Sequence, residues 1–287
     1  MLCRELLGGG CINPDGTRIA TAEGNDGARV WNAADPCKPI PKKESILVVD
    51  KLFALEIPLR VLEAPSRDRT LDVERTEFSP DGKLLITTHA NGHVKVWNTS
   101  SWTVEGELIV TDSRLSVAAF APDGKTVMIG DANGVLHHWS LTTKAETRTL
   151  RTFRGVGSLL NAAFSPDGKT LVATYQSTTS SAMIWNTADW RVETESRYAS
   201  AAFSQDGKLL ALGGPHIKLI EPNSRKQIRD IELPEMTLGE VSRDFVNEPN
   251  AKEKIGCAVF ALAFSPDGHT LAAGCTEGTV RLVKIGS

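Results

Sequence analysis

Phe78-Ser79-Pro80-Asp81-Gly82-Lys83 is a six-residue phrase that recurs along the chain and decides its fold. Close copies begin at Phe120, Phe164, Phe203 and Phe264, and an altered copy begins at Ile12. Glycine adopts positive φ without a steric clash and aspartate bonds nearby backbone, so an Asp-Gly pair reverses the chain tightly. Short apolar runs flank each copy, which predicts the corner of a β-hairpin. Such a corner returning about every forty residues is typical of radial all-β repeats.

The repeats run nearly from end to end, so the 287 residues are expected to form one domain, 1–287. Two insertions, about 33–58 and 234–254, interrupt the period, and the second is charged with few apolar residues, as in a loop. The last unit stops after its third predicted strand. The predicted units are about 1–63, 64–110, 111–152, 153–194, 195–233 and 255–287, and their structural turns are Asp15-Gly16, Asp81-Gly82, Asp123-Gly124, Asp167-Gly168, Asp206-Gly207 and Asp267-Gly268.

Composition excludes several classes of protein. The net charge of −3 argues against a dedicated nucleic-acid binder, which usually carries a basic stripe. No apolar run is long enough to span a bilayer, and the N-terminus is a poor signal peptide, so no membrane partner and a cytoplasmic location are expected. Five cysteines without CxxC spacing favour buried thiols in a reducing compartment over a disulfide framework or zinc site: Cys3, Cys11, Cys37, Cys257 and Cys275.

Four of the predicted third strands end in tryptophan followed by a polar residue. The tryptophans are Trp31, Trp97, Trp139 and Trp185, and the first three follow an Asn-Gly or Asp-Gly turn. This pattern resembles the WD-repeat (WD40) family of β-propellers, and the Pro-Asp-Gly-Lys style resembles its bacterial arrays. The resemblance covers the chain apart from the two insertions. It implies four-stranded antiparallel blades arranged around a channel, with the four tryptophans as structural residues.

The sequence departs from the family pattern in ways that affect the blades. Asn or Ser replaces the Asp that follows Trp, units five and six lack the Trp, and the Gly-His dipeptide before the first strand is absent. The buried polar network that many members build from His and Asp is therefore not expected. We expect the blades to depend on apolar packing and on their turns.

The last blade lacks a fourth strand in the sequence. The fourth strand around Gly106 precedes the turn at Asp123 by a fixed spacing. The same spacing, applied to the turn at Asp15, places the corresponding strand before Met1. We therefore expect a fragment of a longer array, in which upstream residues supply this strand, with a seventh blade and a fusion to N-terminal domains as further expectations.

No residue pattern indicates catalysis, a metal or a cofactor. His89 and His93 flank a hairpin turn and could face each other, but no Cys or acid adjoins them, so a structural role is favoured. His137 and His138 point to opposite faces of a strand, which favours packing. The glycine-rich segments lack the Lys-Ser/Thr of a phosphate loop, and no Gly-x-Ser-x-Gly is present.

The family resemblance implies that loops d–a and b–c, which join strand d to the next blade and strand b to strand c, share one face that binds proteins or peptides. Arg and Tyr are enriched at binding hot spots, although an ordinary solvated charge is the competing interpretation for any one of them. The candidate partner-binding residues on these loops are Arg67, Arg69, Asp112, Arg114, Arg154, Arg197, Tyr198, Arg243 and Phe245.

Three functional hypotheses remain. The first is a non-catalytic scaffold that binds protein partners through loops on one face of a propeller. The alternative is an enzyme-associated or ligand-binding propeller of the peptidase-associated or periplasmic type, whose blades also carry Ser-Pro-Asp-Gly turns. The third is a degraded array without a present partner. The four strand-ending tryptophans favour the WD-repeat hypothesis.

Overall fold

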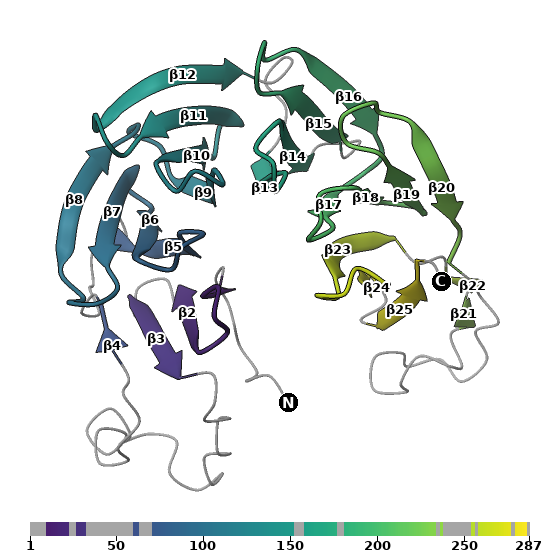
Figure 1. Ribbon diagram of the computed structural model, residues 1–287, viewed down its shortest axis with the longest axis horizontal. Coiled ribbons are helices and arrows are strands. Elements are labelled where there is room, and N and C mark those ends of the chain that lie inside the picture. Colours follow the sequence, from purple (N-terminus) through teal and green to yellow (C-terminus); the bar gives the residue numbers. More distant parts are fainter. Residues whose placement is uncertain are drawn as a thin grey trace, which may run out of the picture. The chain divides into compact units, whose positions relative to one another are not determined.

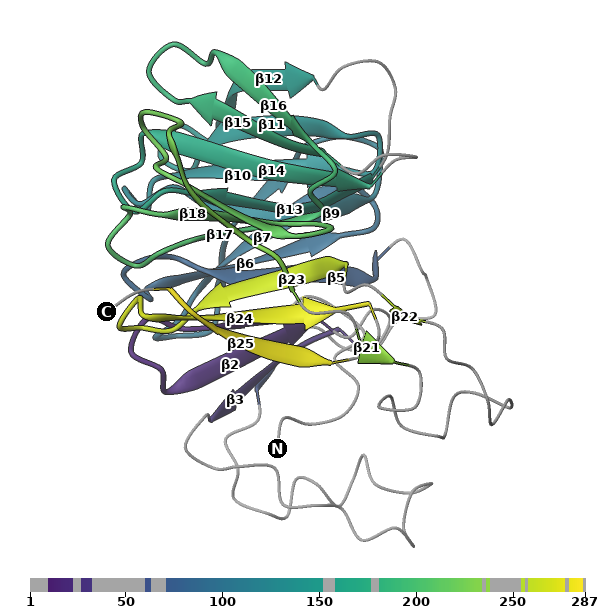
Figure 2. The same ribbon diagram turned by 90° about the vertical axis from the view of Figure 1, so that its right-hand side faces the viewer.

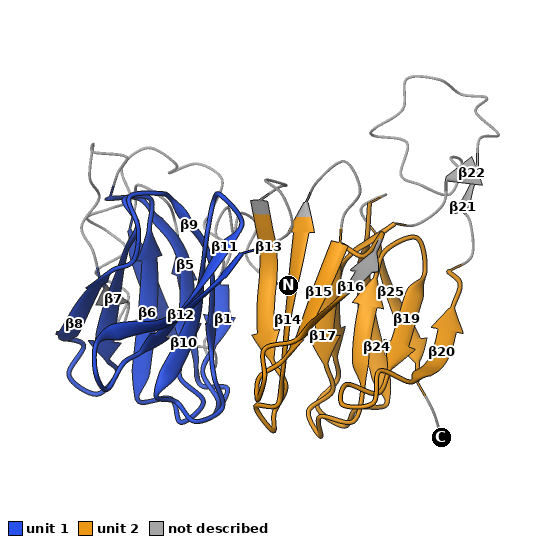
Figure 3. Ribbon diagram, turned by 90° about the horizontal axis from the view of Figure 1, so that it is seen from above, with its two compact units in different colours: residues 1–152 blue, residues 153–287 orange. Residues whose placement is uncertain are grey.

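The computed structural model describes residues 10–22, 27–32, 60–62, 71–151, 158–176, 181–233, 236–237, 254–255, 258–276 and 279–285. The chain divides into two compact units, 1–152 and 153–287, each described here by itself (Figure 3). The unit boundary coincides with the boundary between the third and fourth predicted repeats. In the described residues no helix has the length and apolarity that crossing a membrane requires.

Unit 1 contains three four-stranded antiparallel sheets, and each sheet follows the chain order of its strands (Figure 1). This order results from hairpins, because each strand pairs with the one before it. β4 supplies the fourth strand of the first sheet. The sheets are β1 (Gly10–Ile12), β2 (Arg18–Ala22), β3 (Ala28–Asn32) and β4 (Arg60–Val61); β5 (Val73–Phe78), β6 (Leu84–His89), β7 (His93–Asn98) and β8 (Val104–Ile109); and β9 (Leu115–Phe120), β10 (Thr126–Asp131), β11 (Val135–Ser140) and β12 (Ala145–Arg151).

The described residues of unit 2 form two four-stranded sheets, one three-stranded sheet and one two-stranded sheet. In the three-stranded sheet β23, β24 and β25 lie side by side (Figure 2). The elements are β13 (Ser158–Phe164), β14 (Thr170–Gln176), β15 (Ser181–Asn186) and β16 (Val192–Ser196); β17 (Ser200–Phe203), β18 (Leu210–Gly213), β19 (Ile217–Ile220) and β20 (Gln227–Ile231); β21 (Met236–Thr237) and β22 (Lys254–Ile255); and β23 (Val259–Phe264), β24 (Thr270–Cys275) and β25 (Val280–Lys284). The expected all-β fold of propeller-type blades is confirmed.

Each repeated phrase forms the same turn between the first and second strands of a blade. In the second blade Gly82 N–H donates to Ser79 C=O at 2.8 Å, and Gly82 has φ of 70°. Asp81 Oδ1 accepts from Ser79 Oγ at 2.7 Å and from Lys83 N–H at 3.1 Å. The Ser79 hydrogen bond is the main reason why the pKa of Asp81 is lowered. A turn closed by glycine in the left-handed region matches the twist of a hairpin, which explains why Asp-Gly recurs.

The proline of one turn packs on the glycine of the next turn in the same unit. A Cβ at Gly82 would lie 3.4 Å from Pro14 Cδ, and a Cβ at Gly207 would lie 3.4 Å from Pro166 Cδ. The fifth blade has Gln205 instead of proline, and a Cβ at Gly268, in the sixth, would have nothing within 4 Å. The repeated proline therefore links successive blades as well as shaping its own turn.

Gln205→Pro is expected to raise the free energy of unfolding by about 0.5–1 kcal/mol, because proline restricts the unfolded chain and restores the missing contact with Gly268. Urea unfolding of the two proteins measures this difference. Gln205→Ala is the control, since it removes the same side chain without restricting φ. An equal gain from alanine would contradict the stacking account.

The core lies between neighbouring blades of each unit. Side chains of the third and fourth strands of one blade pack against the first and second strands of the following blade. One buried cluster joins β7 and β8 to β9 and β10, and another joins β19 and β20 to β23 and β24. The first contains Val94, Val96, Leu108, Leu115, Phe120, Val127 and Ile129, and the second contains Ile217, Leu219, Ile231, Val259, Leu271 and Ala273.

A buried polar network is present in the first two blades, which corrects the expectation that apolar packing and turns act alone. Trp31 Nε1 donates to Thr21 Oγ1 at 3.0 Å, and Trp97 Nε1 donates to Thr87 Oγ1 at 3.1 Å. The threonine in the second strand thus anchors the tryptophan of the third strand.

The third blade lacks this bond. The equivalent position of the second strand, opposite His137, is occupied by Ile129 in this blade instead of threonine. Trp139 Nε1 is consequently buried without a hydrogen-bond partner among the described residues. The polar network is therefore a feature of particular blades, and it follows the threonine rather than the tryptophan.

The described cysteines differ from the expected pattern of thiols. Cys275, at the end of β24, is disulfide-bonded, so the expectation of a buried thiol is wrong for this residue. Cys11 is free, and burial, with the charge of Glu77, raises its pKa to about 12. A thiol so rarely ionised is a poor nucleophile.

Candidate functional site

Loops at one end of the second and third blades are tied together by backbone hydrogen bonds. We call segments 71–72, 90–92, 111–114 and 132–134 the loop face of unit 1. Ala90 N–H donates to Asp72 C=O at 2.9 Å, and Ala132 N–H donates to Arg114 C=O at 2.8 Å. Each b–c turn is thereby fixed to the d–a segment that leads into its own blade.

Gly92 joins the second blade to the third at this face. Its C=O accepts from Val110 N–H at 3.1 Å, and its φ is 82°. A Cβ at this position would lie 1.8 Å from Thr111 C=O oxygen. The close approach and the positive φ both require glycine, so the sequence Asn91-Gly92 does more than reverse the strand.

Arg114 and Asp112 are the exposed charges of the d–a segment. Arg114 Nη2 donates to Glu74 Oε2 at 2.6 Å, while 64% of the Arg114 side chain stays exposed. The hydrogen bond to Glu74 is the main cause of the raised pKa of Arg114. This ion pair orients the guanidinium between β5 and β9 but leaves most of its surface accessible. Both residues were predicted to lie in this loop, and both are exposed there.

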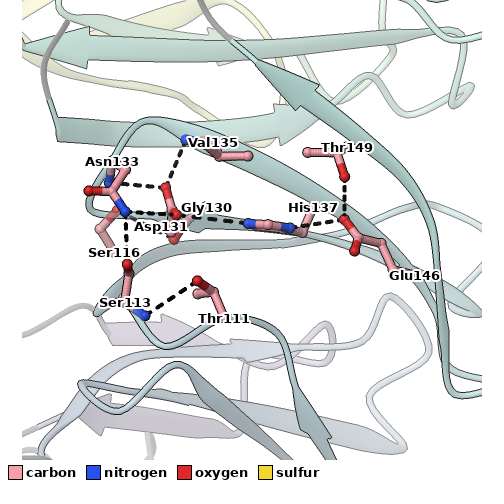
Figure 4. Close-up of polar contacts among 10 residues, drawn as sticks. All are labelled: Thr111, Ser113, Ser116, Gly130, Asp131, Asn133, Val135, His137, Glu146 and Thr149. Carbon is pink, nitrogen blue, oxygen red and sulfur yellow. Dashed lines mark hydrogen bonds and ion pairs between the residues drawn. The ribbon is translucent and has the colours of Figure 1, made fainter. Parts of the chain in front are cut away.

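Asp131 shapes the b–c turn of the third blade from a buried position at the end of β10. Its Oδ1 accepts from Asn133 N–H at 3.0 Å and from Val135 N–H at 2.8 Å. Asn133 in turn donates from Nδ2 to Ser113 Oγ at 2.7 Å (Figure 4). The buried carboxylate therefore holds the exposed Asn133 against the d–a segment.

His137 lies between the carboxylates of Asp131 and Glu146 (Figure 4). Its Nδ1 is 2.9 Å from Glu146 Oε1, and its Nε2 is 3.9 Å from Asp131 Oδ2. Burial raises the pKa of Glu146, but hydrogen bonds from Thr149 and His137, with the charge on His137, outweigh that effect and lower it. Glu146 thus satisfies Nδ1 of His137, whereas Nε2 is buried without a hydrogen-bond partner among the described residues.

His89 and His93 are also held by local partners. His89 is buried, with Nε2 3.1 Å from Thr87 Oγ1 and Nδ1 3.2 Å from Leu71 C=O oxygen. His93 Nδ1 lies 3.0 Å from Glu107 Oε1, so the two histidines that flank the turn do not converge. The described part of the chain has no cluster of His, Cys, Asp or Glu that could hold a metal ion.

Unit 2 has an equivalent junction between a d–a segment and a b–c turn. Tyr198 is buried, its hydroxyl lies 2.9 Å from His216 Nε2, and the two rings meet edge to face. A Cβ at Gly214 would lie 2.0 Å from Arg197 C=O oxygen. The exposed group here is Arg197, whereas Tyr198, also predicted for partner binding, packs in the core. The remaining predicted residues lie outside the described residues: Arg67, Arg69, Arg154, Arg243 and Phe245.

Three residues that build this face were not predicted from the sequence. Glu74, Asp131 and Gly92 were not singled out as functional positions. Glu74 carried a signal, because Val73–Phe78 contains three charges, whereas the matching strand Leu115–Phe120 contains none. Asp131 and Gly92 act through contacts with other loops, which residue spacing does not show.

Comparison with known proteins identifies the repeats. The profile of the WD domain, G-beta repeat (WD40), matches residues 57–98 and 253–284, which include the first three strands of the second blade and the three strands of the sixth. The chain is 29% identical over 99 residues to the Protein LST8 homolog of Drosophila melanogaster. That match covers 34% of this chain and 26% of the fly protein, so the chain spans about a quarter of the relative's length.

These matches agree with the blade structure and with the residues that build it. The profile covers two separate repeats whose Asp-Gly turns and third strands occupy the same places in their sheets. The chain therefore carries repeats that match the WD40 model in these two regions. The match to WD40 repeats suggests, in general terms, a scaffold for protein interactions.

Proposed function

We propose that this protein is a non-catalytic scaffold that binds a protein partner through the loop face of unit 1. The supporting observation is that backbone hydrogen bonds and Gly92 fix the loops, while Asp112 and Arg114 remain exposed. A preorganised surface loses little conformational entropy when a partner binds. Arginine is among the residues that contribute most at binding hot spots.

The charges on this face indicate what its partner presents. Arg114 already shares one carboxylate, that of Glu74, and its remaining exposed surface suits a second acidic or carbonyl group. Asp112 and Arg114 are two residues apart with opposite charge. We therefore expect the partner surface to offer both an acidic and a basic group, with charge complementarity contributing to partner choice.

Arg114→Glu is expected to weaken partner binding about tenfold or more, since it reverses a central charge and breaks the bond with Glu74. Quantitative affinity capture from the source cell, followed by mass spectrometry, measures the loss. Asp112→Arg reverses the second charge without touching the Glu74 bond and should release the same proteins.

Lys125→Glu is the matched control, because Lys125 is exposed on the hairpin turn at the opposite end of the third blade. We expect this variant to capture the same proteins as the unchanged chain. Identical capture by all four proteins would contradict the proposed face.

A further inference from the structure

One ring nitrogen of His137 is buried without a hydrogen bond. Nδ1 of this side chain lies 2.9 Å from Glu146 Oε1, whereas Nε2 has no hydrogen-bond partner among the described residues. The carboxylate of Asp131 stands opposite Nε2, with Oδ2 3.9 Å away, which is too far for a hydrogen bond (Figure 4). Buried polar atoms without partners are rare and lower stability, because they have lost their hydrogen bonds to water.

The contact with Glu146 decides which nitrogen of a neutral His137 carries the proton. Burial raises the pKa of Glu146, but hydrogen bonds from Thr149 and His137 outweigh this effect and lower it, so the carboxylate is ionised near neutral pH. An ionised carboxylate only accepts hydrogen bonds, so the proton must be on Nδ1. Nε2 then presents a lone pair toward Asp131, and two acceptors face each other in a buried place.

A second proton on the imidazole removes this conflict. Both nitrogens of a protonated imidazole donate hydrogen bonds, so Nε2–H would face Asp131 while Nδ1–H stays on Glu146. The positive ring would then lie between two carboxylates, and opposite charges within about 4–6 Å favour the charged form of a side chain. Imidazole ordinarily changes its charge between about pH 5 and 8, so a modest change in pH exchanges the two states.

The two carboxylates are the charged groups that face His137 from neighbouring strands. Asp131 ends β10, Glu146 lies in β12, and His137 makes no further ion pair among the described residues. His138 and Arg148 are paired on the opposite face of the sheet. The elements packed on the face of His137 add Ile129 and Thr149 opposite the ring, Leu108 and Val110 from the second blade, and the exposed Asp112 and Arg114 of the d–a segment.

Asp131 connects His137 to the loop face. Its Oδ1 accepts from the N–H groups of Asn133 and Val135, and its Oδ2 lies 3.3 Å from Asn133 Nδ2. Asn133 Nδ2 also donates to Ser113 Oγ in the d–a segment. An attraction between Nε2–H and Oδ2 would fix the plane of the carboxylate, which keeps Oδ1 in place for the two N–H groups of the turn.

The second blade shows that the turn does not require this pair. At the positions of Asp131 and His137 it has His89 and Lys95, as the pairing of the second and third strands shows. Its b–c turn is held by an uncharged group, because Asn91 Oδ1 accepts from the backbone N–H two residues later at 3.1 Å. A buried acid beside a histidine is therefore not needed to form such a turn.

We propose that His137 is a proton-dependent lock of the loop face. Its protonation holds Asp131 in place, which fixes the b–c turn of the third blade and strengthens partner binding at mildly acidic pH. The step from the turn to the partner rests on the proposed function of the loop face. The lock itself is a property of unit 1 and can be measured without a partner.

Nitrogen NMR of the histidine rings and hydrogen exchange of the whole chain test the lock directly. At about pH 7.5 the proton of His137 should be on Nδ1, and at about pH 5.5 both nitrogens should carry one. The amide of Val135, which donates to Asp131 Oδ1 at 2.8 Å, reports on the turn. Its protection, corrected for the intrinsic exchange rate at each pH, should rise about fivefold from the higher pH to the lower, as expected for one added charge-assisted hydrogen bond.

Two variants separate the lock from a general effect of pH. His137→Gln cannot take up a proton, so the protection of Val135 should change less than about twofold between the two pH values. Asp131→Asn places an amide donor opposite Nε2 and suits the neutral ring, so the pH dependence should reverse, with greater protection at about pH 7.5. Glu107→Gln is the matched control, since it removes the carboxylate 3.0 Å from Nδ1 of His93 on the second blade, and it should leave the response of Val135 unchanged.

Partner binding is measured with the proteins whose capture depends on Arg114. The unchanged chain should capture about three times more of them at about pH 5.5 than at about pH 7.5, and His137→Gln should show no such increase. Absence of any Arg114-dependent capture would contradict the proposed function, while the NMR and exchange results would still decide whether the lock exists.

Any one of four results would overturn the lock. The first two concern the ring: a proton on Nε2 instead of Nδ1 at about pH 7.5, or a neutral ring at about pH 5.5. The other two are equal pH responses of the unchanged chain and His137→Gln, and an Asp131→Asn variant that responds in the same direction as the unchanged chain. Arg114-dependent capture that stays constant with pH while the turn responds would overturn the link to partner binding.

Discussion

Gly92→Ala is expected to lower the free energy of unfolding by about 3 kcal/mol or more, a loss in the range of severe steric defects. The new Cβ would lie 1.8 Å from Thr111 C=O oxygen, and backbone on both sides prevents either group from giving way cheaply. Relief of this overlap requires the d–a segment to move, so the loop face should be lost along with stability. Urea unfolding measures the first effect, and partner capture measures the second.

Gly16→Ala separates the overlap from the cost of the left-handed backbone. Gly16 has φ of 72°, close to that of Gly92, but a Cβ there would meet nothing within 4 Å. This variant should lower the free energy of unfolding by only about 1–2 kcal/mol, because that is what the left-handed region costs an ordinary residue. Equal losses from the two variants would show that the contact with Thr111 is unimportant.

Glu77 is expected to make stability depend on pH near neutrality. Burial raises its pKa from 4.5 to about 7, against a smaller opposite effect of Arg75. The folded protein therefore keeps this proton to higher pH than the unfolded chain does. The contribution of this carboxyl group to the free energy of unfolding is most favourable below about pH 4.5. It is lost as the pH rises through about 7, and the total loss is up to roughly 3 kcal/mol.

Glu77→Gln removes this titration while keeping a similar shape. The variant and the unchanged protein should have similar unfolding free energies at pH 4.5, and the variant should be more stable by up to roughly 3 kcal/mol at pH 8. Urea unfolding at several pH values gives the difference. A difference that stays constant across this range would mean that Glu77 does not titrate as described.

The repeated phrase predicted the turns and blades because their causes are local. Asp81 and Gly82 need only each other and the adjacent Ser79 and Lys83 to form the turn. The alternation within the strands is local as well. These features appear wherever the same residues recur, which is why one phrase could be extended along the chain.

The loop face depends on contacts that are distant in sequence, so it was only partly predictable. Arg114 was identified as an exposed loop charge, but its partner Glu74 lies in the preceding blade. Tyr198 was expected to be exposed, and its burial follows from its contact with His216 across the b–c turn. The local sequence does not indicate which side chains of a loop face inward.

The buried polar groups show the same limit. The absence of Gly-His suggested that no network would form, yet Thr21 and Thr87 anchor the tryptophans of their blades from the second strand. The deciding residue was the threonine across the sheet. The disulfide of Cys275 was also missed, because an odd count without CxxC spacing says little about which cysteines meet in space.

The most direct test of the account is photo-crosslinking from the two ends of the third blade. A photoreactive residue replaces Asp112 on the loop face in one protein and Lys125 on the opposite turn in another, both at exposed positions. The account predicts crosslinks from position 112 to the proteins that Arg114→Glu releases, and none of these from position 125. Crosslinks to those proteins from position 125 alone, or equally from both, would contradict it.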